Sequence, residues 1–138
     1  MTPLVERLAE LHRHLDHLKT LRSKVGSREA LENDLSLHND VLFSLLVVSQ
    51  TVIDIAGELS ARRAEPFEDY TGAIRNLGNH AQFPPELVRS LERLPGFRNV
   101  VVHEYVRVDM QRVVEALGEL EPIEQFLEIV RSMESGAP

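Results

Sequence analysis

The sequence of 138 residues contains no cysteine and no tryptophan. The lack of cysteine excludes disulfides, thiolate nucleophiles and cysteine-ligated zinc or iron–sulfur sites. The first segment, from Met1 to Leu18, mixes charged residues and histidines with regularly spaced leucines, so it has no apolar core of the kind that signal peptides carry. Nothing in these features indicates an exported protein, and we expect a cytoplasmic location.

A long uninterrupted hydrophobic run is absent as well. A membrane-spanning helix needs about 20 mostly apolar residues in succession. The most apolar stretch, residues 41–59, is interrupted by polar residues at Ser44, Ser49, Gln50, Thr51 and Asp54. We therefore expect a core helix here and no membrane segment.

The sequence also lacks the short motifs that mark several enzyme classes. It has no glycine-rich phosphate loop, no H-E-x-x-H zinc motif and no G-x-S-x-G nucleophile elbow. Glu10, His14 and His17 have the i, i+4, i+7 spacing, which could bind a metal but is more typical of a solvated helix face. We assign no metal ligands and no cofactor to this chain.

Positive charge is scarce overall, since the formal net charge is −7. This value disfavours a protein that holds nucleic acid by bulk electrostatics, because neutralising phosphates requires clustered lysine and arginine. The charge is nevertheless uneven. Residues 62–112 carry eight arginines against seven acids, whereas both flanking parts are acidic. The middle of the chain is thus the part that would attract an anionic ligand.

Helical periodicity dominates the hydrophobic pattern. Leucines recur at steps of four and three from Leu4 to Leu18, which places them on one face of a first helix. A long helix is predicted from the cap at Ser27 to about Ala61, and a short one over residues 67–77, ended by a left-handed cap at Gly78 and Asn79.

Three further segments follow the same pattern. Pro84 and Pro85 open another short helix, which Pro95 and Gly96 end. We assign residues 97–105 as helix despite three valines, because a lone strand would have no partner. A last helix, capped by Asp109, is expected to bend or break at Pro122. The sequence thus predicts an all-α, single-domain bundle of about five helices over residues 1–138.

The most informative segment is residues 97–105, in which three valines stand between polar groups. Asn99 and His103 are i, i+4 neighbours on a helix, whereas Arg98 and His103 are about 140° apart. Arg98 and His103 could converge if the helix starts near Arg98, or if two chains bring their copies together across a two-fold axis.

Arg98 and His103 allow two interpretations. Such residues near a helix end are often only caps and surface ion pairs. Their chemistry also suits cleavage of RNA through its own 2′-hydroxyl group, because histidine can both take and give a proton near neutral pH and arginine is a permanent cation matched to phosphate. That reaction requires no metal ion.

The spacing of Arg98, His103 and Tyr105 resembles the signature of HepT-like toxins of the HEPN superfamily, in which arginine, four residues, histidine, one residue and tyrosine follow one another. The resemblance extends over about residues 28–131. It includes an Ile-Asp-Ile-Ala segment at 53–56, a Pro-Phe-x-x-Tyr run at 66–70, a Leu-Gly turn at 77–78 and a Pro-Gly-Phe segment at 95–97.

The resemblance implies a homodimer that cleaves RNA without a metal in a cleft shared by two Arg–His motifs. Arg98 and His103 match the catalytic pair of that family, and Asn99 matches the polar residue that usually follows the arginine, with a supporting or substrate-binding role. Asp54 is either a further polar residue of the cleft or a helix aspartate satisfied by an arginine. An alternative is a non-catalytic HEPN module that binds a nucleotide or a partner.

The resemblance also implies a control mechanism. In type VII toxin–antitoxin systems of the HepT and MntA kind, the partner of the toxin is a minimal nucleotidyltransferase antitoxin, which transfers AMP to the motif tyrosine. That tyrosine corresponds to Tyr105. An AMP group there would place a bulky anion two residues from His103. The other interpretation of Tyr105 is an amphipathic residue at a helix end.

Overall fold

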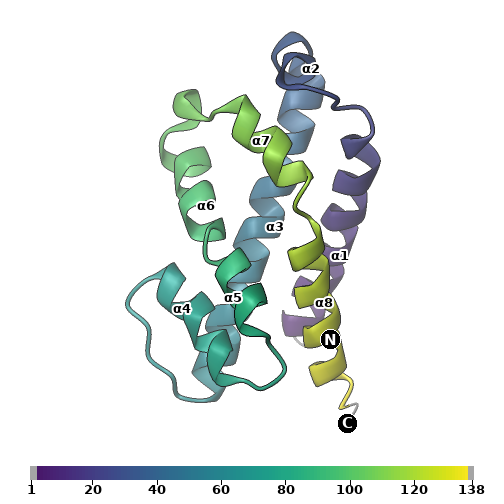
Figure 1. Ribbon diagram of the computed structural model, residues 1–138. Coiled ribbons are helices and arrows are strands. Elements are labelled where there is room, and N and C mark those ends of the chain that lie inside the picture. Colours follow the sequence, from purple (N-terminus) through teal and green to yellow (C-terminus); the bar gives the residue numbers. More distant parts are fainter. Residues whose placement is uncertain (1–2, 137–138) are drawn as a thin grey trace.

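The computed structural model describes residues 3–136, and all of its regular elements in that range are helices (Figure 1). Residues 1, 2, 137 and 138 of the predicted domain lie outside the described residues. The α-helices are α1 (Pro3–Arg22), α2 (Arg28–Asn33), α3 (Leu35–Arg62), α4 (Tyr70–Asn76), α5 (Pro85–Leu91), α6 (Leu94–His103), α7 (Met110–Leu117) and α8 (Glu121–Glu134). Two 3-10 helices, η1 (Leu77–Asn79) and η2 (Tyr105–Arg107), complete the order. The predicted all-α class is confirmed.

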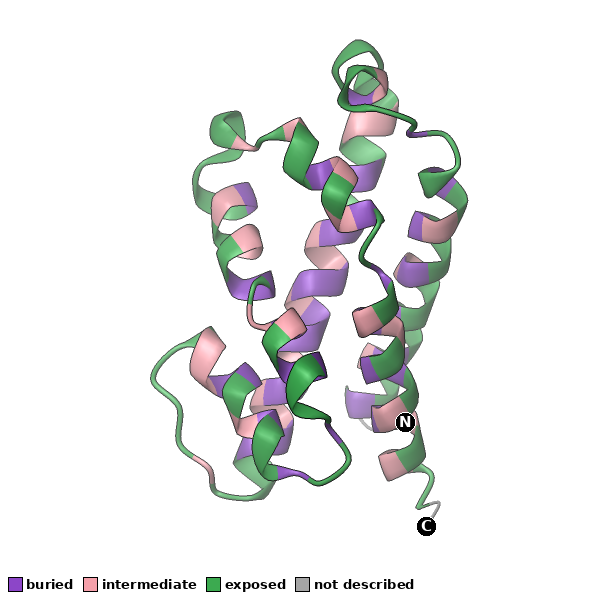
Figure 2. Cartoon of the chain, in the orientation of Figure 1, coloured by how far each residue is buried: buried purple, intermediate pink, exposed green. Residues whose placement is uncertain are grey.

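Helix α3 is the centre of the fold, and α1, α4 and α6 pack around it (Figure 1). It is long and apolar enough to span a membrane by length and composition alone, but 61% of its most apolar window is buried among the other helices. Its buried residues alternate with half-buried ones along its middle (Figure 2). This burial is that of a core helix, as the interrupted hydrophobic run predicted.

The leucine stripe of α1 packs on α3 and α8. All the leucines of the predicted stripe are buried, and Leu21 extends it by one further turn. Glu10, His14 and His17 face polar neighbours: His14 Nδ1 lies 3.0 Å from Ser44 Oγ, and His17 Nε2 lies 2.8 Å from Asp40 Oδ1. These two histidines therefore connect α1 to α3.

The long helix predicted from Ser27 to Ala61 is two helices, which meet at Asp34. The backbone of Asp34 is extended, and its carboxylate accepts a hydrogen bond from the Leu37 amide at 3.1 Å. Aspartate is a strong N-cap because its side chain satisfies an amide that the helix start leaves unpaired. Asp34 therefore begins α3 instead of continuing the preceding helix.

Three further boundaries differ from the prediction. Gly78 and Asn79 form η1 without positive φ, so the predicted left-handed cap is wrong. Residues 95 and 96 lie inside the first turn of α6, since proline needs no amide partner there. The last helix breaks between Leu117 and Glu121, and Pro122 then occupies the first turn of α8.

The turn that follows α3 contains Ala64, the one non-glycine residue with positive φ (54°) among the described residues. The Ala64 amide donates to the Ala61 carbonyl at 3.1 Å, and the Glu65 amide donates to the Ser60 carbonyl at 2.9 Å. These two bonds form a Schellman motif, whose left-handed position favours glycine. Ala64 thus turns the chain sharply toward the loop before α4, at a cost in backbone strain.

We predict that Ala64→Gly raises the free energy of unfolding by about 0.5–1 kcal/mol, because glycine adopts the left-handed conformation without a clash of its side chain. Ala61→Gly, one turn earlier inside α3, is the matched control and should lower it by up to about 1 kcal/mol. Urea unfolding followed by circular dichroism measures both. Equal effects of the two substitutions would contradict the assignment of strain to Ala64.

Candidate functional site

The candidate site is built on α6, which carries Arg98, Asn99 and His103 and packs mainly on α3. The predicted helical state of this segment is confirmed as far as His103, and Tyr105 follows in η2. The helix begins at Leu94, one turn before Arg98. The first of the two routes by which Arg98 and His103 could converge, a helix start near Arg98, is therefore wrong.

The Arg98 side chain is half-buried and held by three neighbours. Its Nε donates a hydrogen bond to Gln50 Oε1 of α3 at 2.7 Å, and its Nη1 donates to Asn99 Oδ1 at 3.0 Å. The guanidinium carbon lies 5.4 Å from the ring centroid of Tyr70, within the range of a cation–π contact. No described carboxylate pairs with Arg98, so its charge remains available to an anion.

Gln50 connects Arg98 to Asp54 one turn along α3. Its Oε1 accepts from Arg98, while its Nε2 donates to Asp54 Oδ1 at 2.8 Å. The bond to Arg98 fixes which end of the amide is the acceptor, and the other end then points to the carboxylate. Asp54 is thus joined to Arg98 through an amide, and the predicted alternative of direct pairing with an arginine is not what the described residues show.

His103 lies at the end of α6 and is exposed. Its side chain makes no hydrogen bond or ion pair with any described residue. The structure brings Arg98, Asn99 and Asp54 into one network, but His103 lies outside it. Within one chain, the Arg98 guanidinium is therefore held in place by hydrogen bonds, whereas the His103 imidazole has no partner among the described residues.

Tyr105 is half exposed, and its hydroxyl faces the first turn of α3. The hydroxyl oxygen lies 3.4 Å from His38 Nδ1 and 3.4 Å from Asn39 Oδ1. The Tyr105 and His38 rings meet edge to face, with centroids 6.0 Å apart. These contacts fix the phenol on the surface at the end of α6, where its hydroxyl can be reached from solvent.

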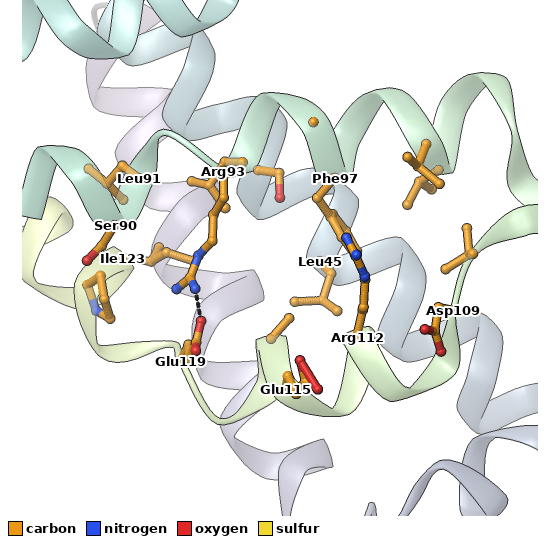
Figure 3. Close-up of a pocket in the computed structure, with 18 of the residues that line it drawn as sticks. Leu45, Ser90, Leu91, Arg93, Phe97, Asp109, Arg112, Glu115, Glu119 and Ile123 are labelled. Atoms are coloured by element: carbon orange, nitrogen blue, oxygen red, sulfur yellow. Dashed lines mark ion pairs between the residues drawn. The ribbon is translucent and has the colours of Figure 1, made fainter.

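A cavity of about 690 Å³ lies on the opposite side of α6, between this helix and α7 and α8 (Figure 3). Phe97 and Leu45 contribute to its apolar lining, and an Arg93–Glu119 ion pair lies at one end (Figure 3). Neither Arg98 nor His103 lines it. The candidate site is therefore an open face of the chain and not this cavity.

The arrangement combines one fixed cation with one exposed imidazole. A preorganised guanidinium can stabilise charge that develops on a phosphate in the transition state. An unpaired histidine can accept or donate a proton near neutral pH. Among the described residues there is no group of three or more histidine, aspartate or glutamate side chains placed to hold a metal ion.

Three residues of this region were not predicted from the sequence as part of the site: Gln50, Tyr70 and His38. In the sequence, Gln50 is one of the polar residues that interrupt the most apolar stretch. That interruption was the available signal, because a half-buried amide requires hydrogen-bond partners. Tyr70 ends the Pro-Phe-x-x-Tyr run, but nothing in that run indicates a contact with Arg98, and His38 gave no comparable signal.

Comparison with protein families gives a match to the family described as Ribonuclease HepT-like over residues 11–130. Two curated relatives are similar over most of their length. The mRNA nuclease HepT of Shewanella oneidensis is 21% identical over 131 residues, which cover 94% of this chain and 96% of the relative. The tRNA nuclease HepT of Aphanizomenon flos-aquae is 30% identical over 117 residues, which cover 81% of this chain and 76% of the relative.

Solved structures share the fold. The tri-AMPylated Shewanella oneidensis HEPN toxin, solved in complex with an MNT antitoxin, superposes with a TM-score of 0.80 at 21% identity, covering 96% of this chain and 99% of the toxin. A toxin–antitoxin structure with AMP-PNP gives the same TM-score, identity and coverage. At this level of identity, the likeness shows that the helices are arranged in the same way.

We predict that Gln50→Leu frees the Arg98 side chain, because leucine removes the acceptor that holds Nε. The NMR order parameter of the Arg98 Nε–H bond should fall to the flexible range, below about 0.6. Gln111→Leu, on the exposed face of α7, is the control and should leave that bond unchanged. An Arg98 order parameter that stays high in Gln50→Leu would mean that Tyr70 and Asn99 suffice to hold the guanidinium.

Proposed function

The chain belongs to the HepT-like ribonuclease family, and we propose that it is the toxin of a toxin–antitoxin pair, a cytoplasmic endoribonuclease that cleaves RNA without a metal ion. Arg98 and His103 are its catalytic residues, and Asn99 supports Arg98. The observation that carries the proposal is the pairing of an anchored guanidinium, free of carboxylate partners, with an exposed histidine on one helix.

The reaction uses the 2′-hydroxyl of the RNA as nucleophile. One His103 takes the 2′-hydroxyl proton, and the 2′-oxygen forms a bond to the adjacent phosphorus. The bond from phosphorus to the 5′-oxygen of the next nucleotide breaks, and that oxygen receives a proton from the second His103 of a dimer. Arg98 stabilises the additional negative charge on the phosphoryl oxygens, so the chemistry does not depend on a metal ion.

A homodimer is proposed because one chain does not assemble the site. Arg98 and His103 project about 140° apart from α6, and the chain does not bring them into contact. The neighbouring surface is apolar: Phe43 is 60% exposed and Val106 is 97% exposed. On α3, Phe43 lies on the same face as Asn39 and Gln50. Asn39 contacts Tyr105, and Gln50 contacts Arg98, so this face of α3 runs along the whole motif. A second copy would cover this apolar surface and bring the two motifs together.

The proposed partner is a minimal nucleotidyltransferase antitoxin that transfers AMP to Tyr105. The neighbouring structure of an AMPylated HEPN toxin with its MNT antitoxin supports this assignment. The Tyr105 hydroxyl is on the surface, and the phenol is 50% exposed. An attached AMP would add a bulky anion beside His103 and would repel the phosphates of an RNA substrate.

We predict that the purified chain, freed of antitoxin and treated with EDTA, cleaves RNA, and that His103→Ala lowers the cleavage rate at least about 100-fold, because the proton-transfer group is lost. His12→Ala, an exposed histidine on α1, is the control and should cleave at the normal rate. Cleavage is followed on single-stranded RNA by gel electrophoresis.

Two results of this experiment would contradict the proposal. Full activity in His103→Ala would exclude His103 as a catalytic residue. A wild-type chain that binds RNA or nucleotide but never cleaves would favour the alternative of a non-catalytic binding module.

We predict that co-expression with a cognate nucleotidyltransferase increases the mass of the chain by one or more AMP units and that Tyr105→Phe abolishes the increase. Phenylalanine keeps the ring contact with His38 and removes only the acceptor oxygen. Tyr70→Phe is the matched control and should still be modified. Intact-protein mass spectrometry measures both, and an unchanged mass increase in Tyr105→Phe would place the acceptor elsewhere.

A further inference from the structure

A second, smaller pocket of about 260 Å³ lies on the side of α3 that faces α4. Two of its lining residues are tied to Arg98. The Tyr70 ring lies under the guanidinium, and Asp54 is joined to it through Gln50. Arg98 does not line the pocket itself, but these two contacts place a group bound there near a phosphate held at Arg98.

Two aromatic side chains form one side of this pocket, and both remain exposed. Phe67 is 42% exposed and Tyr70 is 40% exposed. The tip of the Phe67 ring comes close to α3 at Gly57, where a β-carbon would lie 3.6 Å from Cζ. At this point the Phe67 ring therefore packs against the backbone of α3, because Gly57 has no side chain to separate them.

The loop that carries Phe67 is held by hydrogen bonds on both sides of this residue. The Asn76 side-chain amide donates to the Pro66 carbonyl at 3.3 Å, directly before Phe67. After it, the Asp69 carboxylate caps α4 by accepting from the Gly72 amide at 2.7 Å. The fold thus presents an exposed aromatic ring in a fixed position, which lowers the entropic cost of stacking a ligand on it.

Of the two carboxylates that line this pocket, Asp54 and Glu58, only Asp54 has an oxygen available to accept a hydrogen bond from a ligand. Glu58 is paired with Arg7 at 3.4 Å and with Arg62 at 3.3 Å. Asp54 accepts one hydrogen bond, from Gln50 to Oδ1, and no described residue donates to its Oδ2. The pocket therefore offers aromatic surface and one free carboxylate oxygen.

We infer that this pocket binds one nucleobase of the RNA, adjacent to the phosphate at Arg98; this inference rests on the proposed function. The base stacks on Phe67 and Tyr70, as unpaired bases do on exposed aromatic side chains. Asp54 accepts a hydrogen bond from an amino group on the base edge. Adenine, cytosine and guanine carry such a group, whereas uracil offers only a ring N3–H between two carbonyl oxygens that repel a carboxylate, so Asp54 disfavours uracil at this position.

The test of stacking compares two substitutions of the same residue. Phe67→Leu keeps the apolar contact with α3 but removes the aromatic face, and it should lower kcat/KM for a short single-stranded RNA about 10-fold or more. Phe67→Tyr keeps the face and should stay within about 2-fold of the wild type. Thermal unfolding of both variants by circular dichroism checks that the loop remains folded.

The test of base selection uses Asp54→Asn, which keeps the shape and an acceptor for Gln50 but removes the carboxylate. Sequencing the ends of cleaved RNA from a random library gives the base distribution around the cut. The wild type should deplete uracil at one position beside the scissile phosphate, and Asp54→Asn should lose this depletion.

A binding measurement separates this inference from the proposed function. RNA affinity is measured by fluorescence anisotropy in the His103→Ala background, with and without Phe67→Leu. A 10-fold or greater loss of affinity supports the base pocket, whether or not the wild type cleaves RNA. Unchanged affinity on Phe67→Leu, or a base distribution that Asp54→Asn leaves as it was, would overturn the inference even if the wild type is an active ribonuclease.

Discussion

The packing of α6 on α3 is the contact on which the candidate site depends. Leu94, Pro95 and Val101 are the buried residues of α6, and the hydrogen bond from Arg98 to Gln50 ties the middle of this helix to the middle of α3. On its other side, α6 borders a cavity of about 690 Å³. A single interface therefore fixes both the helix and the direction of its guanidinium, and a change that displaces α6 from α3 also displaces Arg98.

Much of the fold could be predicted from the sequence, because helix periodicity and capping are local properties. The leucine stripe of α1, the core character of α3 and the helical state of residues 97–103 follow from them. The break at Asp34 was not predicted, since an aspartate within a continuous helical pattern is compatible with either a surface position or a cap. The last break lies at residues 118–120, before α8, and Pro122 is accommodated in the first turn of that helix.

The candidate site was predictable in its residue types but not in its geometry. Arg98, His103 and Tyr105 are adjacent in sequence and form a pattern, whereas Gln50, Tyr70 and His38 lie 48, 28 and 67 residues from their contacts. Such pairs depend on how α3, α4 and α6 pack, which a single sequence does not determine. The overall charge of −7 does not describe the surroundings of Arg98, because most of the acids lie in the two ends of the chain and Arg98 has no described carboxylate partner.

The different surroundings of Arg98 and His103 match the different requirements of their proposed roles. A group that stabilises charge is most effective when it is already oriented, since reorientation during the reaction costs free energy. A group that moves a proton must be able to reach its oxygen on the RNA and to change its charge, and an ion pair would oppose that change. The chain anchors Arg98 and leaves His103 unpaired, but it keeps them on different faces of one helix. In the proposed homodimer, a two-fold axis next to α6 would resolve this conflict, because each guanidinium could then work with the histidine of the other copy while both helices keep the packing that folds them.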